Sequence, residues 1–473
     1  MVSGKRKKNR AIRFGWIIAC GMVLVLFGVM VVLRLCIPSK NATAQREVQR
    51  RIDAIHKTGQ PVSIKELAVR YPEPPPERDA VLLLKPALAA FTYPEDKEEL
   101  PLFGGKWPEP DSKFSEETIN AIRAFVDQNR KSIELVPRDD LKTAWVGAGF
   151  VNGFTNLAVV PISEMGALVR VLCLDAVLQA TARNSKAAAQ SLEKALLIAH
   201  TLKSDTILHG GAKGTWSKTS CESLMQVLSQ TEISDFDLKS ISDLLPEIEI
   251  GFSKELFVNE RCFGLSGAEY FSSLANLARG RRGSIGDWWV GEYQARLIYR
   301  DQDLMEYLGV LDSYIAAMDL PLSNGIPKLA ELDQSREKRE AQFIAERSGV
   351  FGRLFPRSIS LLSILSAPKG KHWLEAEGTV VASERAAKTA IAVERYRLSH
   401  AGMAPENLSA LVPEFLTAVP KDPFDNQDLR FKKLQHGFMV YSIGPDFADD
   451  SGKPEPHEAK DSDHYDIVFF VAR

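Results

Sequence analysis

Two consecutive stretches, ISEMGALVRVLCLDAVLQATAR (residues 162–183) and KAAAQSLEKALLIAHTL (residues 186–202), decide the fold of this chain. Apolar residues recur in both at spacings of three and four, as at Leu168 and Leu172, which is typical of helices that bury one face. The link between them, Asn184-Ser185, is short and polar. The two stretches are therefore predicted to form an antiparallel helical hairpin.

Helical periodicity extends to both sides of this hairpin. Glycines at 210, 211 and 214 weaken the start of the next predicted helix, and Pro246 is expected to end the one after it. Stacked helical hairpins are therefore expected over a helical domain at residues 115–370. Besides the hairpin, its predicted helices are 116–133, about 206–230, 236–245 and 304–318.

The last hundred residues change character. Glu384 to Ser399 reads as a helix with apolar residues along one face. Three short strands are predicted after it, at residues 429–432, 438–442 and 467–471. The expected architecture is thus mainly α, with a small C-terminal α+β domain over residues 380–473 that contains an antiparallel sheet.

The N-terminus predicts a membrane anchor. An uncharged run from Gly15 to Leu33 spans about 28 Å as a helix, close to the hydrocarbon thickness of a bilayer. Residues 1–14 carry six cations and no acid, which favours a cytoplasmic N-terminus and places the bulk of the chain outside the inner membrane, in the periplasm. A cleaved signal peptide is the alternative, but Arg34-Leu35-Cys36 is a poor cleavage site. We predict an uncleaved, single-pass signal-anchor at 15–37, followed by a linker with irregular segments over 38–114.

Composition narrows the classes of function. Among 473 residues, 59 lysines and arginines oppose 61 acids, so a net charge of −2 gives no field to attract nucleic acid. Five cysteines exclude a disulfide-built scaffold, although a Cys221–Cys262 disulfide is allowed outside the cytoplasm. No metalloprotease, phosphate-loop, nucleophile-elbow or dinucleotide motif occurs. The sequence therefore names no reaction and no catalytic residue.

Four blocks near the C-terminus occur in a characteristic order. They are Glu394-Arg395-Tyr396-Arg397-Leu398, Val419-Pro420-Lys421-Asp422-Pro423-Phe424-Asp425-Asn426, Tyr441-Ser442-Ile443-Gly444-Pro445-Asp446, and Asp466-Ile467. Their order resembles that in the globular domain of the major pseudopilin of type II secretion, a type IV pilin-like protein. The whole layout is also similar to large bacterial envelope proteins of unassigned function. Phe14-Gly15-Trp16-Ile17 stands where that family has its acidic start sequence, so processing by a prepilin peptidase is not expected.

The resemblance implies a calcium site. Its matching positions are Asp446 and Asp466, with carbonyl groups near Ser442, and with Asp449 and Asp450 as further ligands. Independently of the resemblance, residues 446–466 hold eight acids against two lysines, and calcium prefers six to eight oxygen ligands. The alternatives are a solvated acidic loop without an ion and a transition-metal site using His457 or His464.

Two functions remain open at the level of sequence. One is a non-enzymatic envelope protein that binds protein partners or acts as a scaffold, in connection with type II secretion as the resemblance implies. The other is an extracytoplasmic enzyme whose active site lies in the helical domain without a visible motif, because catalytic groups need only be close in space.

Overall fold

The computed structural model describes residues 45–105, 107–108, 114–153, 160–245, 250–280, 301–348, 369–454 and 465–472. They divide into two compact units. The first contains residues 45–62, 268–280 and 301–309 of these; its segment 45–57 is helical, and Arg51 Nη1 donates to Met305 O at 3.0 Å. The second unit contains the remaining described residues.

The predicted cytoplasmic tail (1–14) and anchor (15–37) lie outside the described residues. From residue 45 onward, none of the helices that the structure describes is both long and apolar enough to cross a bilayer.

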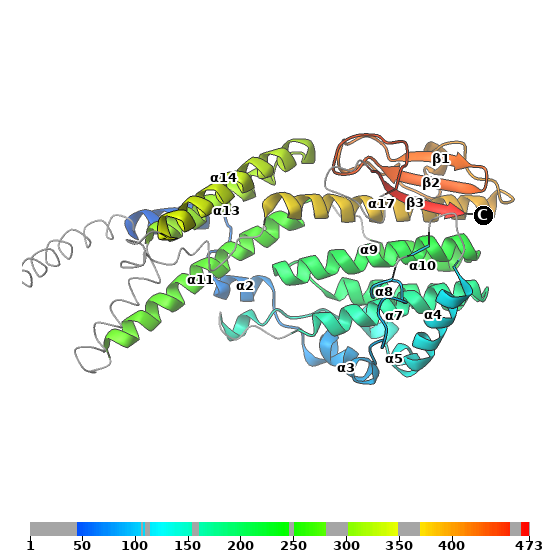
Figure 1. Ribbon diagram of the computed structural model, residues 1–473, viewed down its shortest axis with the longest axis horizontal. Helices are drawn as coiled ribbons and strands as arrows, with labels where there is room; N and C mark the ends of the chain where they lie inside the picture. Colours follow the sequence, from blue (N-terminus) through cyan, green and yellow to red (C-terminus); the bar gives the residue numbers. More distant parts are fainter. Residues whose placement is uncertain are drawn as a thin grey trace, which may run out of the picture. The chain divides into compact units, whose positions relative to one another are not determined.

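The second unit is mainly helical and carries a small antiparallel sheet, which confirms the predicted fold class at this level (Figure 1). Its short 3-10 turns are η1 (Pro76–Arg78), η2 (Phe150–Asn152) and η3 (Leu408–Leu411). Two helices, α11 (Phe252–Gly280) and α13 (Asp301–Ala317), contribute residues to both units. The other helices are α2 (Ile64–Arg70), α3 (Ala80–Ala90), α4 (Glu116–Gln128), α5 (Arg130–Glu134), α6 (Arg138–Leu141), α7 (Ile162–Thr181), α8 (Ser185–Thr201), α9 (Ile207–Gln230), α10 (Asp235–Leu244), α14 (Leu322–Ser348) and α17 (Gly370–Ser399).

The predicted hairpin is formed by α7 and α8, which pack against each other. Asn184 is the N-cap of α8, and its side chain accepts a hydrogen bond from Ala187 N at 3.4 Å. A buried contact holds the pair together: Ser191 Oγ on α8 donates to Asp175 Oδ2 on α7 at 2.5 Å. The remaining oxygen of Asp175 accepts from Arg130 at 2.9 Å, so the buried carboxylate is paired as well as hydrogen-bonded.

Helix α9 begins at Ile207 and runs without interruption through the glycines that were expected to weaken it. The reason is close packing. A Cβ atom on Gly210 would lie 2.6 Å from Leu256, one on Gly211 would lie 3.0 Å from the Trp373 ring, and one on Gly214 would lie 3.2 Å from Val380. The missing side chains let α11 and α17 approach the α9 backbone, and this tertiary packing outweighs the low helix propensity of glycine.

The sheet contains β1 (Arg430–Leu434), β2 (Gly437–Ser442) and β3 (Ile467–Ala472) in that order, all antiparallel. The turn between β1 and β2 falls close to its predicted place. Gly437 has φ +117°, and a Cβ there would lie 1.8 Å from Val471 O, so glycine is required on both counts. Buried Phe438 and Phe469 belong to the same hydrophobic cluster as α17 residues such as Ile391, so one sheet face packs on this helix (Figure 1).

Helix α17 is about twice as long as the 384–399 segment predicted for it, since it begins at Gly370. Asp333 on α14 accounts for the earlier start. Its carboxylate accepts from Gly370 N at 3.2 Å and from Lys371 N at 3.0 Å, which satisfies amides of the first turn. The predicted helix 116–133 is instead divided into α4 and α5 at Asn129. This residue is fully buried, and its side chain forms hydrogen bonds with the backbone of Thr92 and of Phe125.

The C-terminal segment and the helical body share one hydrophobic cluster. Val177, Leu192 and Leu224 from the body pack in it together with residues of α17 and the sheet. A second cluster lies among α3, α4, α7 and α8. The two predicted segments, 115–370 and 380–473, are therefore joined through a common core.

The three described cysteines, Cys173, Cys221 and Cys262, are buried thiols. Cys221 belongs to the shared cluster, whereas Cys262 packs beside Phe150 in a different one. The Cys221–Cys262 disulfide that the sequence allowed is thus not formed.

Candidate functional site

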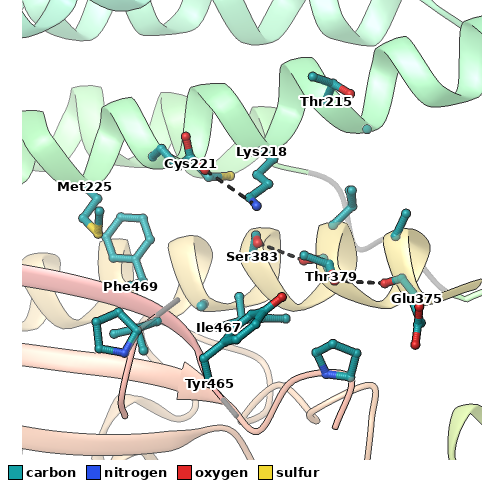
Figure 2. A pocket seen from close by; sticks show the side chains of 18 of the residues that line it. Thr215, Lys218, Cys221, Met225, Glu375, Thr379, Ser383, Tyr465, Ile467 and Phe469 are labelled. Carbon is teal, nitrogen blue, oxygen red and sulfur yellow. Dashed lines mark hydrogen bonds and ion pairs between the residues drawn. The ribbon is translucent and has the colours of Figure 1, made fainter. Parts of the chain in front are cut away.

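A cavity of about 560 Å³ lies where α9, α17 and the β3 end of the sheet meet (Figure 2). Helix α9 contributes Lys218 and Met225 to its wall, α17 contributes Thr379 and Ser383, and the segment entering β3 contributes Tyr465. Its volume is in the range of small-molecule sites, which occupy about 300–1,000 Å³. The cavity is therefore the candidate binding site of the second unit.

The α17 wall owes its position to the glycines of α9. The Trp373 ring lies over Gly211, where a Cβ would come within 3.0 Å of its Cη2 atom, and the ring forms part of the cavity lining. Val380, seven residues or about two turns further along α17, lies over Gly214 in the same manner. The absence of side chains at Gly211 and Gly214 of α9 thus determines the position of Trp373 and Val380 in the cavity wall.

The β3 wall is held by hydrogen bonds from its backbone amides to side chains of α9. Phe470 N lies 3.2 Å from Met225 Sδ, and Ala472 N donates to Ser229 Oγ at 3.1 Å. β3 is the outer strand on this side of the sheet, and these contacts satisfy amides that would otherwise form an open edge. Helix α9 therefore closes the sheet edge and supports one side of the cavity with the same face.

Three hydroxyl groups that α9 and α17 contribute to the wall donate within their own helix. Thr215 Oγ1 donates to Gly211 O at 2.9 Å, Thr379 Oγ1 to Glu375 O at 2.9 Å, and Ser383 Oγ to Thr379 O at 2.8 Å. Because a hydroxyl has a single proton, these three groups offer a ligand only their acceptor lone pairs.

The charged groups that α9 and α17 contribute to the wall are partly exposed and form pairs along their helices. Lys218 Nζ lies 3.9 Å from Glu222 Oε1 on α9, and Lys371 Nζ lies 3.3 Å from Glu375 Oε1 on α17. Pairs of this type contribute about 0.3–0.5 kcal/mol. They leave the carboxylates able to exchange partners at little cost.

A buried polar group lies behind the wall, between α9 and α17. Ser217 Oγ donates to Glu384 Oε1, while Glu384 Oε2 is enclosed and has no hydrogen-bond partner in the described part of the chain. Burial raises the pKa of Glu384 to about 7, against the opposing effects of Ser217 and of Lys213. Burial also lowers the pKa of Lys213, which lies close enough to interact with this carboxylate.

This group is the arrangement in α9 and α17 that comes nearest to a catalytic one, since it combines a hydroxyl, a carboxyl and an amine. Ser217 is only 2% exposed, however, and its proton is directed at Glu384. The nearby Cys221 is also enclosed, and burial raises the pKa of its thiol well above the ordinary value. Ser217 and Glu384 are therefore enclosed between the two helices, whereas Cys221 is a buried thiol that also borders the cavity.

Two of the predicted calcium ligands are buried and engaged. Ser442 Oγ donates to Asp422 Oδ1 at 2.8 Å. Asp466 is 1% exposed, and its two oxygens accept from Asp450 N at 3.3 Å and from Gly452 N at 2.6 Å. Asp466 therefore holds the 450–452 turn against the start of β3.

Of the other three predicted ligands, Asp450 lies in the turn that Asp466 holds, and Asp446 and Asp449 lie just before it. Asp446 Oδ1 accepts from Ala448 N at 3.1 Å, and Asp449 Oδ1 accepts from Ser451 N at 2.9 Å. Asp450 Oδ2 is buried without a hydrogen-bond partner among the described residues. The structure thus brings Asp450 and Asp466 together, whereas Ser442 faces the neighbouring Asp422.

No group of three or more His, Cys, Asp or Glu side chains close enough to hold a metal ion occurs within the described ranges. His457 and His464, the ligands of the transition-metal alternative, and four acids of the predicted loop lie outside those ranges.

Sequence reasoning missed the role of Asp422. This side chain is 0% exposed and accepts from Phe424 N at 3.0 Å, Ile443 N at 2.9 Å and Arg430 Nη1 at 2.6 Å, besides Ser442. It ties the loop before β1 to the end of β2. Its place inside the Pro-Lys-Asp-Pro block was visible in the sequence, but its partners were not.

Comparisons of the chain with protein-family models, with curated proteins and with solved structures found no match.

Proposed function

We propose that this chain is a non-enzymatic, membrane-anchored envelope protein that holds a pilin-like C-terminal module on a helical body, where it binds protein partners or acts as a scaffold. The observation that carries this proposal is the packing of α17. That helix is covered by α9, α10, α14 and the sheet of the same chain.

Enclosure of α17 separates this role from that of a fibre subunit. Its buried residues extend from Leu374 through Val381 to Val393, almost from one end of the helix to the other. A helix committed to its own core along this length is not available to identical modules of neighbouring chains. The resemblance to the major pseudopilin is then limited to the C-terminal module. In this chain α17 packs against the helical body of the same molecule and not against neighbouring subunits of a fibre.

The proposed location rests on the sequence before residue 38. With the anchor at 15–37 and the N-terminus in the cytoplasm, both compact units lie outside the inner membrane. Reporter enzymes fused after Pro38 test this directly. An alkaline phosphatase fusion is expected to be active and a cytoplasm-dependent reporter inactive; the reverse pattern would overturn the topology.

The scaffold role is tested by the assembly state of the full chain in a neutral detergent. Light scattering during gel filtration is expected to give one molar mass over a hundredfold range of concentration. Growth into filaments or an open series of oligomers would contradict the proposal, because α17 would then have to leave its own core.

Calcium binding is proposed for the turn at residues 446–452. The supporting observation is Asp450 Oδ2, a buried carboxylate oxygen without a hydrogen-bond partner in the described residues, beside the turn that Asp466 holds. Asp450 would supply this carboxylate oxygen. Asp446, Asp449, Asp466 and the carbonyls near Ser442, which are not gathered around one point in the described residues, would have to move toward the ion. A bound calcium ion would offset the repulsion among these acids and stiffen the turn.

Calorimetric titration of the full chain with calcium, followed by EDTA, tests this site. Binding heat and a higher melting temperature are expected, and Asp450→Asn is expected to remove both, whereas the surface control Glu331→Gln should not. Absence of heat and of a thermal shift in the unmodified chain would refute calcium binding.

A further inference from the structure

We propose that the cavity between α9, α17 and β3 binds an organic cation, namely an alkyl chain bearing ammonium or guanidinium groups. The source of this chemistry is either a free polyamine or a basic side chain of a peptide. The proposal depends on neither the membrane anchor nor the likeness to pseudopilins.

The cavity has a size and an access that suit such a ligand. Its volume of about 560 Å³ exceeds that of an extended alkylamine and lies within the usual range for small-molecule sites. Side chains in its wall reach solvent: Lys218 is 41% exposed and Glu375 is 25% exposed. A charged ligand can therefore enter without a rearrangement of the helices.

Aromatic rings form much of the apolar lining. Trp373 lies over Gly211 on one side, Tyr465 projects from the β3 side, and Trp107 adds a second indole. Alkyl chains pack on such rings, and cations are attracted to their faces by about 0.5–2 kcal/mol. A ligand with methylene groups between charged ends matches this surface.

Three hydroxyls of the polar lining favour a hydrogen-bond donor, whereas Trp107 Nε1 in the same lining is itself a buried donor without a hydrogen-bond partner in the described part of the chain. The hydroxyls of Thr215, Thr379 and Ser383 have used their protons on helix carbonyls, so each presents lone pairs. Ammonium and guanidinium groups are donors without acceptors, which is the complement of this arrangement.

Charge favours a cation over a neutral polyol or an anion. The lining contains the partly exposed carboxylates of Glu222 and Glu375 and the ammonium of Lys218; Asp466 also borders the cavity, but its two oxygens accept from backbone amides. Glu222 and Glu375 come from α9 and α17, so a ligand with two basic groups can meet a carboxylate on either wall. The lysine partners of these acids lie at 3.9 and 3.3 Å on exposed helix surfaces, where their displacement costs little.

The test is calorimetric titration of the full chain in nanodiscs of zwitterionic lipid. Spermidine is the first probe and the tripeptide Ala-Arg-Ala is the second; maltose and decanoate serve as neutral and anionic comparisons. Saturable binding of spermidine supports a polyamine site. Binding of the tripeptide without spermidine supports a basic side chain of a peptide.

Two charge variants should change the affinity for a cation in opposite directions, and an anionic ligand would show the reverse pattern. Glu375→Gln is expected to weaken binding about fivefold to tenfold, and Lys218→Met to tighten it by a similar factor. Glu331→Gln is the matched control, because it removes a carboxylate that is likewise paired with a lysine of its own helix, at 3.0 Å, on α14. All three positions are partly or largely exposed, so the variants are expected to fold.

Several outcomes would overturn the proposal. They are no binding of either cation, tighter binding of decanoate or maltose than of both cations, and equal affinity of Glu375→Gln and the control. Weaker binding in Lys218→Met would also contradict it, because that result requires an anionic ligand.

Discussion

Replacement of Glu384 by glutamine tests the buried group between α9 and α17. Burial raises the pKa of this carboxyl from 4.5 to about 7 in the folded chain. The folded state therefore binds the proton more tightly than the unfolded state does. The stability that this group contributes is present below pH 4.5 and is lost as the pH rises to about 7, with no further change above that.

The size of the effect follows from the pKa difference. Each pH unit between the two pKa values corresponds to about 1.4 kcal/mol, so ionisation of Glu384 costs roughly 3 kcal/mol by pH 8. Glutamine keeps the shape but not the charge. At pH 8 the variant should be about 2 kcal/mol more stable than the unmodified chain, after allowance for a weaker hydrogen bond from Ser217. At pH 5 the two should be nearly equal.

Urea unfolding followed by tryptophan fluorescence at pH 5, 6, 7 and 8 measures this difference. Burial also raises the pKa of Glu260 to about 7, so the pH dependence of each protein contains a second contribution that cancels in the comparison. Glu331→Gln, on the surface of α14, is the control and should follow the unmodified chain. A stability difference between Glu384→Gln and the unmodified chain that stays constant from pH 5 to pH 8 would refute the reasoning.

Three further predictions, two for the C-terminal module and one for the start of α17, are checked by urea unfolding of the full chain. Gly437→Ala should lower the free energy of unfolding by more than about 2 kcal/mol, because φ is +117° and the new Cβ would meet Val471 O. The control Gly402→Ala, with φ +82° and open space around the new Cβ, should lower it by about 1 kcal/mol. Equal losses would contradict the steric argument. Asp422→Asn should lower the free energy of unfolding by about 3 kcal/mol, because it breaks a buried ion pair with Arg430. Asp425→Asn should lower it by less, since Asp425 is 26% exposed and Arg430 keeps its pair with Asp422. A larger loss in Asp425→Asn than in Asp422→Asn would contradict this reasoning. Asp333→Ala should cost about 2 kcal/mol and speed hydrogen exchange in the first turn of α17, and unchanged exchange there would show that another group holds that turn.

The sequence predicted those features that depend on neighbours along the chain. The periodicity of 162–202 and its polar link were sufficient for α7 and α8, and alternation with a glycine turn placed the strands within a few residues. In each case the residues that determine the element are close together in the sequence, so the local pattern is sufficient to predict it.

Features set by distant contacts were not predictable in this way. Gly211 weakens an isolated helix, and only its contact with Trp373, far along the chain, makes it favourable. The early start of α17 depends on Asp333 of another helix. The candidate cavity is assembled from α9, α17 and β3, and no local motif marks it, although the glycine pair with a third glycine three residues on was a visible sign of close packing.

Hydrogen exchange under increasing urea, read by mass spectrometry on the full chain, tests most directly whether the module is built into the body. Peptides covering β3 and α9 should become exchangeable in the same step, since Phe470 and Ala472 amides contact Met225 and Ser229 and both elements share one core. Opening of the β strands at a urea concentration where α9 stays protected would contradict this account and make the module an independent unit.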